Sequence, residues 1–252
     1  MHNTFILTGS SGKLGSAIRA SGMFHSLLTP SRKEMDIEDQ ESVVSYLDKV
    51  KFDGIIHCAA LARMKACEED PSLAIRVNTI GTAHLVNAIA KKEKTTKKSI
   101  RFIHLSTDGV YTSIGGPHKE NGPTIPYNLY GWTKLGAECA ARTLSNHCII
   151  RTSFFDPKNI LFETAATDMF SSRLPISEFV SAIHFLSSSS FIGAINVGEE
   201  RESDYARYKR FKPSIAPTTF SDIQKSVPFC LAKDSTLDIT LWKSLEEKTT
   251  KH

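Results

Sequence analysis

A glycine-rich turn between an apolar run and a helical pattern constrains the fold of this chain most. Residues 5–8 are apolar and β-prone, Gly9, Gly12 and Gly15 follow at regular spacing, and a helical pattern covers residues 16–20. Gly9 permits a tight turn, Gly12 lets the backbone approach phosphate groups, and Gly15 lets the helix lie against its strand. The free N–H groups at a helix start attract anions. This order of strand, turn and helix predicts a dinucleotide-binding site.

Strand-like and helix-like segments alternate along the first part of the chain. Further apolar runs at residues 25–29, 53–60 and 100–105 are expected as strands, and helical patterns cover about 36–50 and 71–90. Alternation of this kind predicts an α/β fold with a Rossmann-like, doubly wound parallel sheet. The lysine-rich residues 91–98 are expected to form a connecting loop.

Two units are predicted. Residues 1–152 are expected to form an NAD(P)-binding Rossmann domain, and residues 153–252 a small C-terminal substrate lobe. Within the second unit, an apolar segment at about 192–197 has glycines at both ends. We expect it to return to the main sheet as its last strand.

The loop after the second predicted strand indicates which cofactor binds. It presents Ser31, Arg32 and Lys33 where a dinucleotide fold meets the adenosine ribose. An NAD enzyme usually has a carboxylate there, whereas a hydroxyl and a guanidinium can hold a 2′-phosphate. The loop therefore favours NADPH as the cofactor. NADH stays possible, because the carboxylates of Glu34 and Asp36 follow only a few residues further on.

Composition excludes several classes of protein. The net charge is only +4, and the basic stretches are typical of solvated surface, so no nucleic-acid partner is predicted. No apolar run is long enough to span a bilayer, and no secretory leader or metal-ligand cluster is recognisable. The five cysteines include no CxxC pair and are odd in number, which favours reduced thiols in the cytoplasm.

Candidate catalytic residues gather after the fourth predicted strand. Ser106, Thr107 and Asp108 stand at the carboxyl end of that strand, at the edge where open α/β sheets bind ligands. Tyr130 and Lys134 are four residues apart at the head of a helix and therefore share one face. A phenol has a pKa of about 10, and a nearby ammonium favours its ionised form. The Thr107 hydroxyl can reach the same substrate carbonyl oxygen.

Together these motifs resemble the extended short-chain dehydrogenase/reductase family, and most closely its dTDP-4-dehydrorhamnose reductase branch. The resemblance covers about residues 5–153 and implies hydride transfer from NAD(P)H to a 4-keto-6-deoxy sugar nucleotide. It implies that Tyr130 is the general acid and that Lys134 holds the nicotinamide ribose and tunes Tyr130. Thr107 would bind the keto oxygen. The residues expected at the substrate are Thr107, Asp108 and Phe154. The residues expected at the cofactor are Gly9, Ser11, Gly12, Lys13, Leu14, Gly15, Ser31, Arg32, Asp36, Ile37, Ala59, Ala60, Leu61, Asn78, Tyr130 and Lys134.

One departure separates two reaction types within this resemblance. Related dehydratases carry Thr-Asp-Glu after the fourth strand, and the acidic pair serves as acid and base. Here the third position is Gly109, so the second carboxylate is missing. This favours a reductase over a dehydratase.

Two other functions remain open. One is a non-catalytic dinucleotide-binding subunit, since the family also contains a regulatory subunit of methionine adenosyltransferase. The other is a sugar nucleotide epimerase that keeps NAD tightly bound. The fold further predicts a homodimer.

Overall fold

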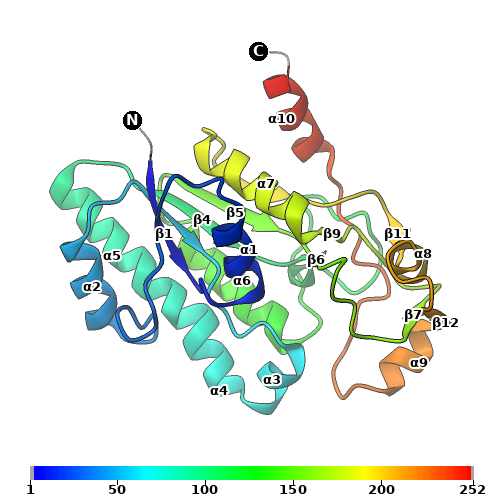
Figure 1. Cartoon of the computed structure of the whole chain (residues 1–252). Coiled ribbons are helices and arrows are strands. Elements are labelled where there is room, and N and C mark those ends of the chain that lie inside the picture. Colours follow the sequence, from blue (N-terminus) through cyan, green and yellow to red (C-terminus); the bar gives the residue numbers. More distant parts are fainter. Residues whose placement is uncertain (1–2, 251–252) are drawn as a thin grey trace.

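Six parallel strands form the central sheet of the computed structural model, which describes residues 3–250 (Figure 1). The strand order is β10-β5-β4-β3-β1-β2. The strands are β1 (Thr4–Thr8), β2 (Ser26–Leu28), β3 (Gly54–His57), β4 (Arg101–Leu105), β5 (His147–Arg151) and β10 (Gly193–Asn196). Every residue of β3, β4 and β5 is buried, as expected for parallel strands covered on both faces.

The chain changes direction across the sheet at β1. It first adds β2 on one side of β1 and then crosses to add β3 on the other side. Such a reversal leaves a crevice at the carboxyl ends of β1 and β3, because the connecting helices lie on opposite faces. The predicted Rossmann-like, doubly wound α/β fold is confirmed.

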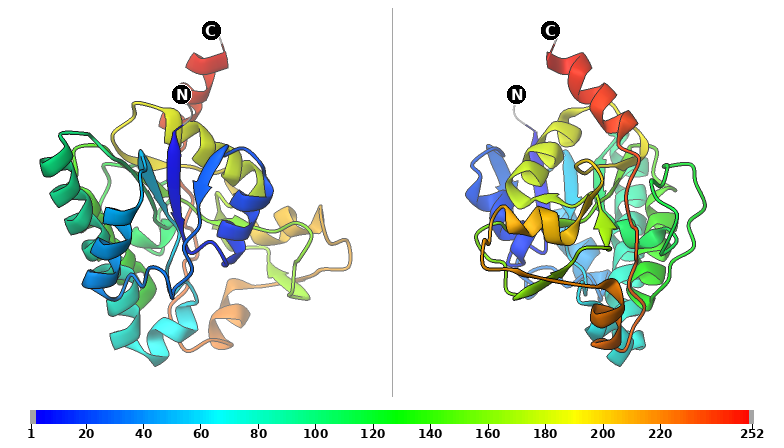
Figure 2. Two further views of the ribbon diagram at one scale, coloured as in Figure 1. Left: turned by 60° about the vertical axis from the view of Figure 1, so that its left-hand side comes forward. Right: turned by 90° about the vertical axis from the view of Figure 1, so that its right-hand side faces the viewer.

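Helices cover both faces of the sheet, with α1 and α7 on one side and α2, α5 and α6 on the other (Figure 2). Successive strand side chains point to opposite faces, so Leu7 packs on the α1 side and Ile6 on the α2 side. The longer helices are α1 (Lys13–Ala20), α2 (Gln40–Lys49), α5 (Gly81–Thr96), α6 (Leu129–Ala141), α7 (Ile176–Ser188) and α10 (Thr240–Thr250).

Two helix boundaries differ from the sequence prediction. The helix expected from residue 36 begins at Gln40, because the Asp39 side chain accepts a hydrogen bond from the Glu41 amide and caps it. Residues 91–96, expected as loop, continue α5. Lysine is a good helix former, and Lys92 lies 5.4 Å from the Phe52 ring centre, so its stem covers apolar surface.

The helix expected over residues 71–90 is a continuous helical run with a change of winding. It comprises α4 (Pro71–Ala74), the π-helical segment η1 (Ile75–Ile80) and then α5. Single π turns inside helices are frequent at functional sites. Here the segment carries Asn78, which is buried.

After residue 152 the chain moves between the main sheet and a small lobe, seen at the right of Figure 1. The strand expected at about 192–197 is β10, which pairs with β5. Helix α7 and β10 pack on the main sheet, whereas Phe155, Tyr208 and Ile215 build a separate small core. The other short elements are α3 (Met64–Glu69), η2 (Asp108–Val110), β6 (Phe154–Phe155), β7 (Thr164–Ala166), β8 (Phe170–Ser171), β9 (Leu174–Pro175), β11 (Glu202–Ser203), α8 (Asp204–Lys209), β12 (Ala216–Thr218) and α9 (Phe220–Lys225).

The chain then returns from the lobe before α10. Asp234 forms an isolated β-bridge with Phe170, and Leu237 forms one with His118. The α10 helix follows and packs Trp242 against Phe185 of α7, with 5.6 Å between ring centres. Within residues 3–250, no helix combines the length and the apolar character that a bilayer span requires. All five cysteines are free thiols.

Candidate active site

The glycine turn after β1 is shaped so that only glycine fits at two of its positions. Gly9 has a φ of +68°, and a Cβ there would stand 2.7 Å from the Ala59 nitrogen. A Cβ on Gly15 would stand 2.2 Å from the Gly9 carbonyl oxygen, so the helix could not lie against the turn. Gly12 is the N-cap of α1 and supplies no side-chain cap. The first N–H groups of α1 are therefore left for an anion.

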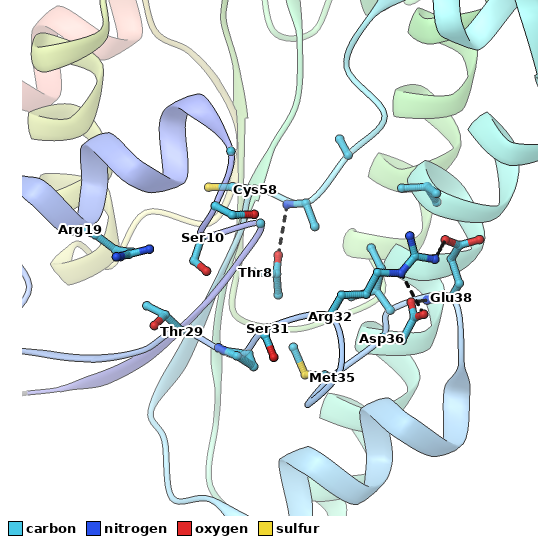
Figure 3. Close-up of a pocket in the computed structure, with 18 residues that line it drawn as sticks. Thr8, Ser10, Arg19, Thr29, Ser31, Arg32, Met35, Asp36, Glu38 and Cys58 are labelled. Atoms are coloured by element: carbon cyan, nitrogen blue, oxygen red, sulfur yellow. Dashed lines mark hydrogen bonds and ion pairs between the residues drawn. The ribbon is translucent and has the colours of Figure 1, made fainter.

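A cleft of about 560 Å³ opens beside this turn, at the carboxyl ends of β1, β2 and β3 (Figure 3). Its lining includes nine residues expected at the cofactor: Gly9, Ser11, Gly12, Ser31, Arg32, Asp36, Ile37, Ala59 and Ala60. Small residues at positions 59 and 60 leave room for a planar group against the backbone. A glycine cradle, an uncapped helix start and a cleft of this size fit a dinucleotide.

The other residues expected at the cofactor do not line this cleft. Leu14 is buried in the core, and Gly15 packs on the turn itself. Asn78 holds the main chain of Leu61: its Oδ1 accepts from the Leu61 amide at 2.7 Å, and its Nδ2 donates to the Leu61 carbonyl at 3.1 Å. Asn78 thus fixes the segment after β3. Lys13, Tyr130 and Lys134 also lie outside the lining.

Arg32 is engaged with carboxylates of its own loop (Figure 3). Its Nε lies 3.0 Å from Asp36 Oδ2, and a terminal nitrogen lies 2.5 Å from Glu38 Oε1. Ser31 is engaged too, since its amide and hydroxyl both donate to Glu34 Oε2 at 2.8 Å. The residues expected to bind a 2′-phosphate therefore have acidic partners, because Glu34, Asp36 and Glu38 stand within the same loop.

The predicted catalytic residues are brought to one place. Thr107 follows β4, and the Tyr130 phenol is close enough to its hydroxyl for a hydrogen bond to influence the phenol. Burial is the main cause that raises the pKa of Tyr130, and the Asp108 carboxylate adds to it. Tyr130 therefore holds its proton at neutral pH, the form in which a phenol donates.

Lys134 is buried one helical turn beyond Tyr130. Burial lowers its pKa to about 8, while Glu138 and Cys58 partly oppose the shift. Its Nζ lies 3.4 Å from His104 Nε2. Burial holds the pKa of His104 well below its usual value, with Lys134 and His57 adding to the effect. The neutral imidazole can therefore accept a hydrogen bond from the ammonium.

A buried ion pair involves Glu138, which lies one turn after Lys134 on α6. Arg151 donates to Glu138 Oε2 at 2.7 Å, and Ser106 donates to Glu138 Oε1 at 2.6 Å. Both charged side chains are almost fully buried. The pair ties α6 to the ends of β4 and β5, and so fixes the helix that carries Tyr130 and Lys134.

Each oxygen of the Asp108 carboxylate accepts a hydrogen bond from a hydroxyl group. Thr107 donates to its Oδ1 at 3.1 Å, and Ser235 donates to its Oδ2 at 2.8 Å. A carboxylate has about four acceptor sites, so each oxygen still has room for one donor from a ligand. Contact between Asp108 and the sugar stays a prediction.

Tyr127 is a site residue that the sequence reasoning missed. Its hydroxyl lies 3.7 Å from the point where a Cβ on Gly109 would stand, beside Thr107. Burial raises the pKa of Tyr127, with Asp108 adding to the shift. The missing side chain at position 109 leaves space next to a second phenol. Two features of the sequence could have pointed to Tyr127: the missing side chain at Gly109 and a second tyrosine three residues before Tyr130.

Phe154, expected at the substrate, packs one side of its ring on the core, and its contact with the substrate stays a prediction. Its ring stacks on Phe179 of α7 with 5.3 Å between centres, and it remains only partly exposed. Its position on β6 is next to the site, but the stacked ring fills the space between β6 and α7.

Fold and cleft together define a Rossmann-like α/β protein with a cleft that fits a dinucleotide. Residues 3–163 match the family described as RmlD substrate binding domain, so the chain belongs to this family. This agrees with the resemblance seen in the sequence.

Curated relatives carry reductase names. A dTDP-4-keto-6-deoxy-D-glucose reductase of Streptomyces niveus is 33% identical over 159 residues, which cover 61% of this chain and 53% of the relative. A dTDP-4-dehydrorhamnose reductase of Mycolicibacterium smegmatis is 30% identical over 144 residues, covering 56% and 42%. The matched part thus spans about half the length of these relatives.

Another relative carries a different name. Methionine adenosyltransferase 2 subunit beta of Xenopus laevis is 29% identical over 144 residues, covering 54% of this chain and 41% of the relative.

Solved structures share the whole fold. A dTDP-4-dehydrorhamnose reductase of Bacillus anthracis in complex with NADP superimposes with a TM-score of 0.84 at 19% identity, covering 100% of both chains. At this identity the likeness establishes the fold.

Proposed function

We propose that this chain is an NADPH-dependent reductase of a 4-keto-6-deoxy sugar nucleotide, similar to dTDP-4-dehydrorhamnose. The observation that carries the proposal is the grouping of Thr107, Tyr130 and Lys134 at the carboxyl end of β4, next to a cleft that fits a dinucleotide. The reductase names of the relatives support the same substrate class.

NADPH, held in the cleft beside the glycine turn, would supply the hydride in this reaction. Tyr130 donates the proton to the developing alkoxide, because its raised pKa keeps the phenol protonated. Thr107 positions the keto oxygen with its hydroxyl. Lys134, buried one turn away, is assigned to the nicotinamide ribose. Within residues 153–252, the lobe built around Phe155, Tyr208 and Ile215 is assigned to the substrate, whereas α7 and β10 belong to the main sheet.

The test is a turnover assay with a purified 4-keto-6-deoxy sugar nucleotide and NADPH. The expected result is loss of reduced-nicotinamide absorbance and formation of the 4-hydroxy sugar nucleotide. Tyr46→Phe, on the remote helix α2, is the matched control for Tyr130→Phe and should retain activity. A protein that binds NADPH but consumes none with any such substrate would contradict the proposal.

A non-catalytic subunit is the second candidate, favoured by the relative named methionine adenosyltransferase 2 subunit beta. It predicts cofactor binding without turnover and a stable complex with a methionine adenosyltransferase. An epimerase predicts nicotinamide absorbance in the purified protein and activity without added cofactor. The turnover assay together with the absorbance spectrum of the purified protein separates all three.

We also propose a homodimer in the cytoplasm. Trp132 on α6 and Ile75 and Ile80 on η1 are 53%, 44% and 40% exposed on neighbouring elements. Because these two elements pack against each other, we take their exposed apolar side chains as the candidate dimer surface. Light scattering of the wild type and of Trp132→Glu would test this, since the charge should shift the molecular mass toward 27.9 kDa.

A further inference from the structure

Two arginines line the cofactor cleft from opposite sides (Figure 3). Arg32 stands in the loop after β2 and is paired with Asp36 and Glu38. Glu38 is itself shared with Arg76, at 3.4 Å. A phosphate brought to Arg32 would have to compete with two carboxylates, and it would stand close to their negative charges.

Arg19 is in a different situation. It belongs to the last turn of α1, and Figure 3 shows its guanidinium directed toward Ser10 of the glycine turn, with Thr29 on the same side. Among the residues that the structure describes, Arg19 forms no ion pair. It therefore contributes an uncompensated positive charge to this end of the cleft.

We propose that Arg19, rather than Arg32, binds the 2′-phosphate of NADPH and so sets the preference for this cofactor. The inference depends on the NADPH part of the proposed function and adds the residue that selects the cofactor. A guanidinium binds phosphate oxygens through parallel charge-assisted hydrogen bonds, and hydroxyls such as those of Ser10 and Thr29 can donate to the remaining oxygens. Arg32 then serves to neutralise Asp36 and Glu38, so that the loop does not repel the phosphate.

Arg19 has a competing role as a simple helix-end cation. A basic residue in the last turn of a helix is favoured by the helix dipole. Lys49 holds the same position in α2, outside the cleft, and is exposed. Lys49→Ala is therefore a matched control for Arg19→Ala.

The experiment measures binding of 2′,5′-ADP and of 5′-AMP by titration calorimetry. These probes differ by the 2′-phosphate and need no catalysis. The wild type is expected to bind 2′,5′-ADP about 10- to 100-fold more tightly, the range for hydrogen bonds to charged groups. Arg19→Ala should reduce this ratio to about threefold or less and leave 5′-AMP binding unchanged. Arg32→Ala and Lys49→Ala should keep most of the ratio.

Three results would overturn the inference. In the first, Arg32→Ala abolishes the affinity ratio and Arg19→Ala keeps it. In the second, Arg19→Ala weakens binding of both probes equally, and in the third, the wild type binds both probes with the same affinity. A wild type without preference that still reduces the sugar nucleotide with NADH would leave the reductase proposal intact. An Arg19-dependent preference in a protein without turnover would keep this inference and remove the reductase.

Discussion

The carboxylate of Asp108 accepts a hydrogen bond at 2.8 Å from Ser235, a residue 127 positions further along the chain. Asp108 belongs to the segment that follows β4, and Ser235 belongs to the segment that returns from the small lobe. The bond is buried and joins the candidate active site at the edge of the sheet to the last part of the chain.

Ser235→Ala is expected to lower the free energy of unfolding by about 1–3 kcal/mol, because it leaves one oxygen of a buried carboxylate without its donor. Urea unfolding would measure the loss. Ser181→Ala, on the exposed face of α7, is the matched control and should change stability by less than about 0.5 kcal/mol. Equal losses in the two variants would mean that the Ser235–Asp108 hydrogen bond adds nothing to the free energy of unfolding.

Tyr130→Phe should lower kcat by about 100-fold or more, since it removes the proton donor and keeps the ring. Binding of NADPH should stay within about threefold of the wild type. Because burial and Asp108 raise the pKa of Tyr130, its titration should not appear in the neutral range of the pH–rate profile. Steady-state kinetics over pH 6–10 would check both points, and a kcat within tenfold of the wild type would exclude Tyr130 as the acid.

Lys134→Met should abolish activity but stabilise the fold at pH 7 by about 1–3 kcal/mol. Burial lowers the pKa of Lys134 from 10.5 to about 8, so the folded protein carries the cost of a buried charge at any pH below 8. Between about pH 8 and 10.5 the unfolded chain binds this proton and the folded one does not. Stability of the wild type therefore rises with pH across that window, and the advantage of methionine shrinks.

Urea unfolding of wild type and Lys134→Met at pH 7 and pH 10 would measure this difference. Lys49→Met, at an exposed position, is the control and should not stabilise the fold at pH 7. An advantage of the same size at both pH values would show that the fold does not lower the pKa of Lys134.

Tyr127→Phe should raise KM for the sugar nucleotide about 3- to 10-fold and leave kcat within threefold, the effect of one lost neutral hydrogen bond. The hydroxyl stands beside Thr107, at the space that Gly109 leaves open. Kinetics with the substrate at saturating NADPH would measure the split. If only thermal stability changed, Tyr127 would be a packing residue.

Local sequence signals predicted the glycine turn after β1 and the helix that carries Tyr130 and Lys134. The turn around Gly9 and Gly15 is dictated by close backbone contacts, and the spacing of Tyr130 and Lys134 needs only helix geometry. Both depend on residues close together in the chain, so pattern and sterics suffice.

Side-chain interactions could not be predicted from the sequence where the partner is distant in the chain or where two partners compete. Arg32 was expected to meet a phosphate, but its choice between a ligand and Asp36 depends on the path of the loop. Arg19 looks like an ordinary helix-end cation until the cleft places it opposite Arg32. The partner of Asp108 could not be anticipated, because no periodicity links Asp108 to Ser235.

The two edges of the sheet are short. The edge strand β2 has three residues and the edge strand β10 has four, so few unpaired main-chain groups face outward. A second copy of the chain would find little to pair with at either edge, and continuous β-sheet formation between copies is disfavoured. Self-association of this protein is therefore expected to proceed through helical surfaces, and the concentrated protein should resist forming strand-paired aggregates.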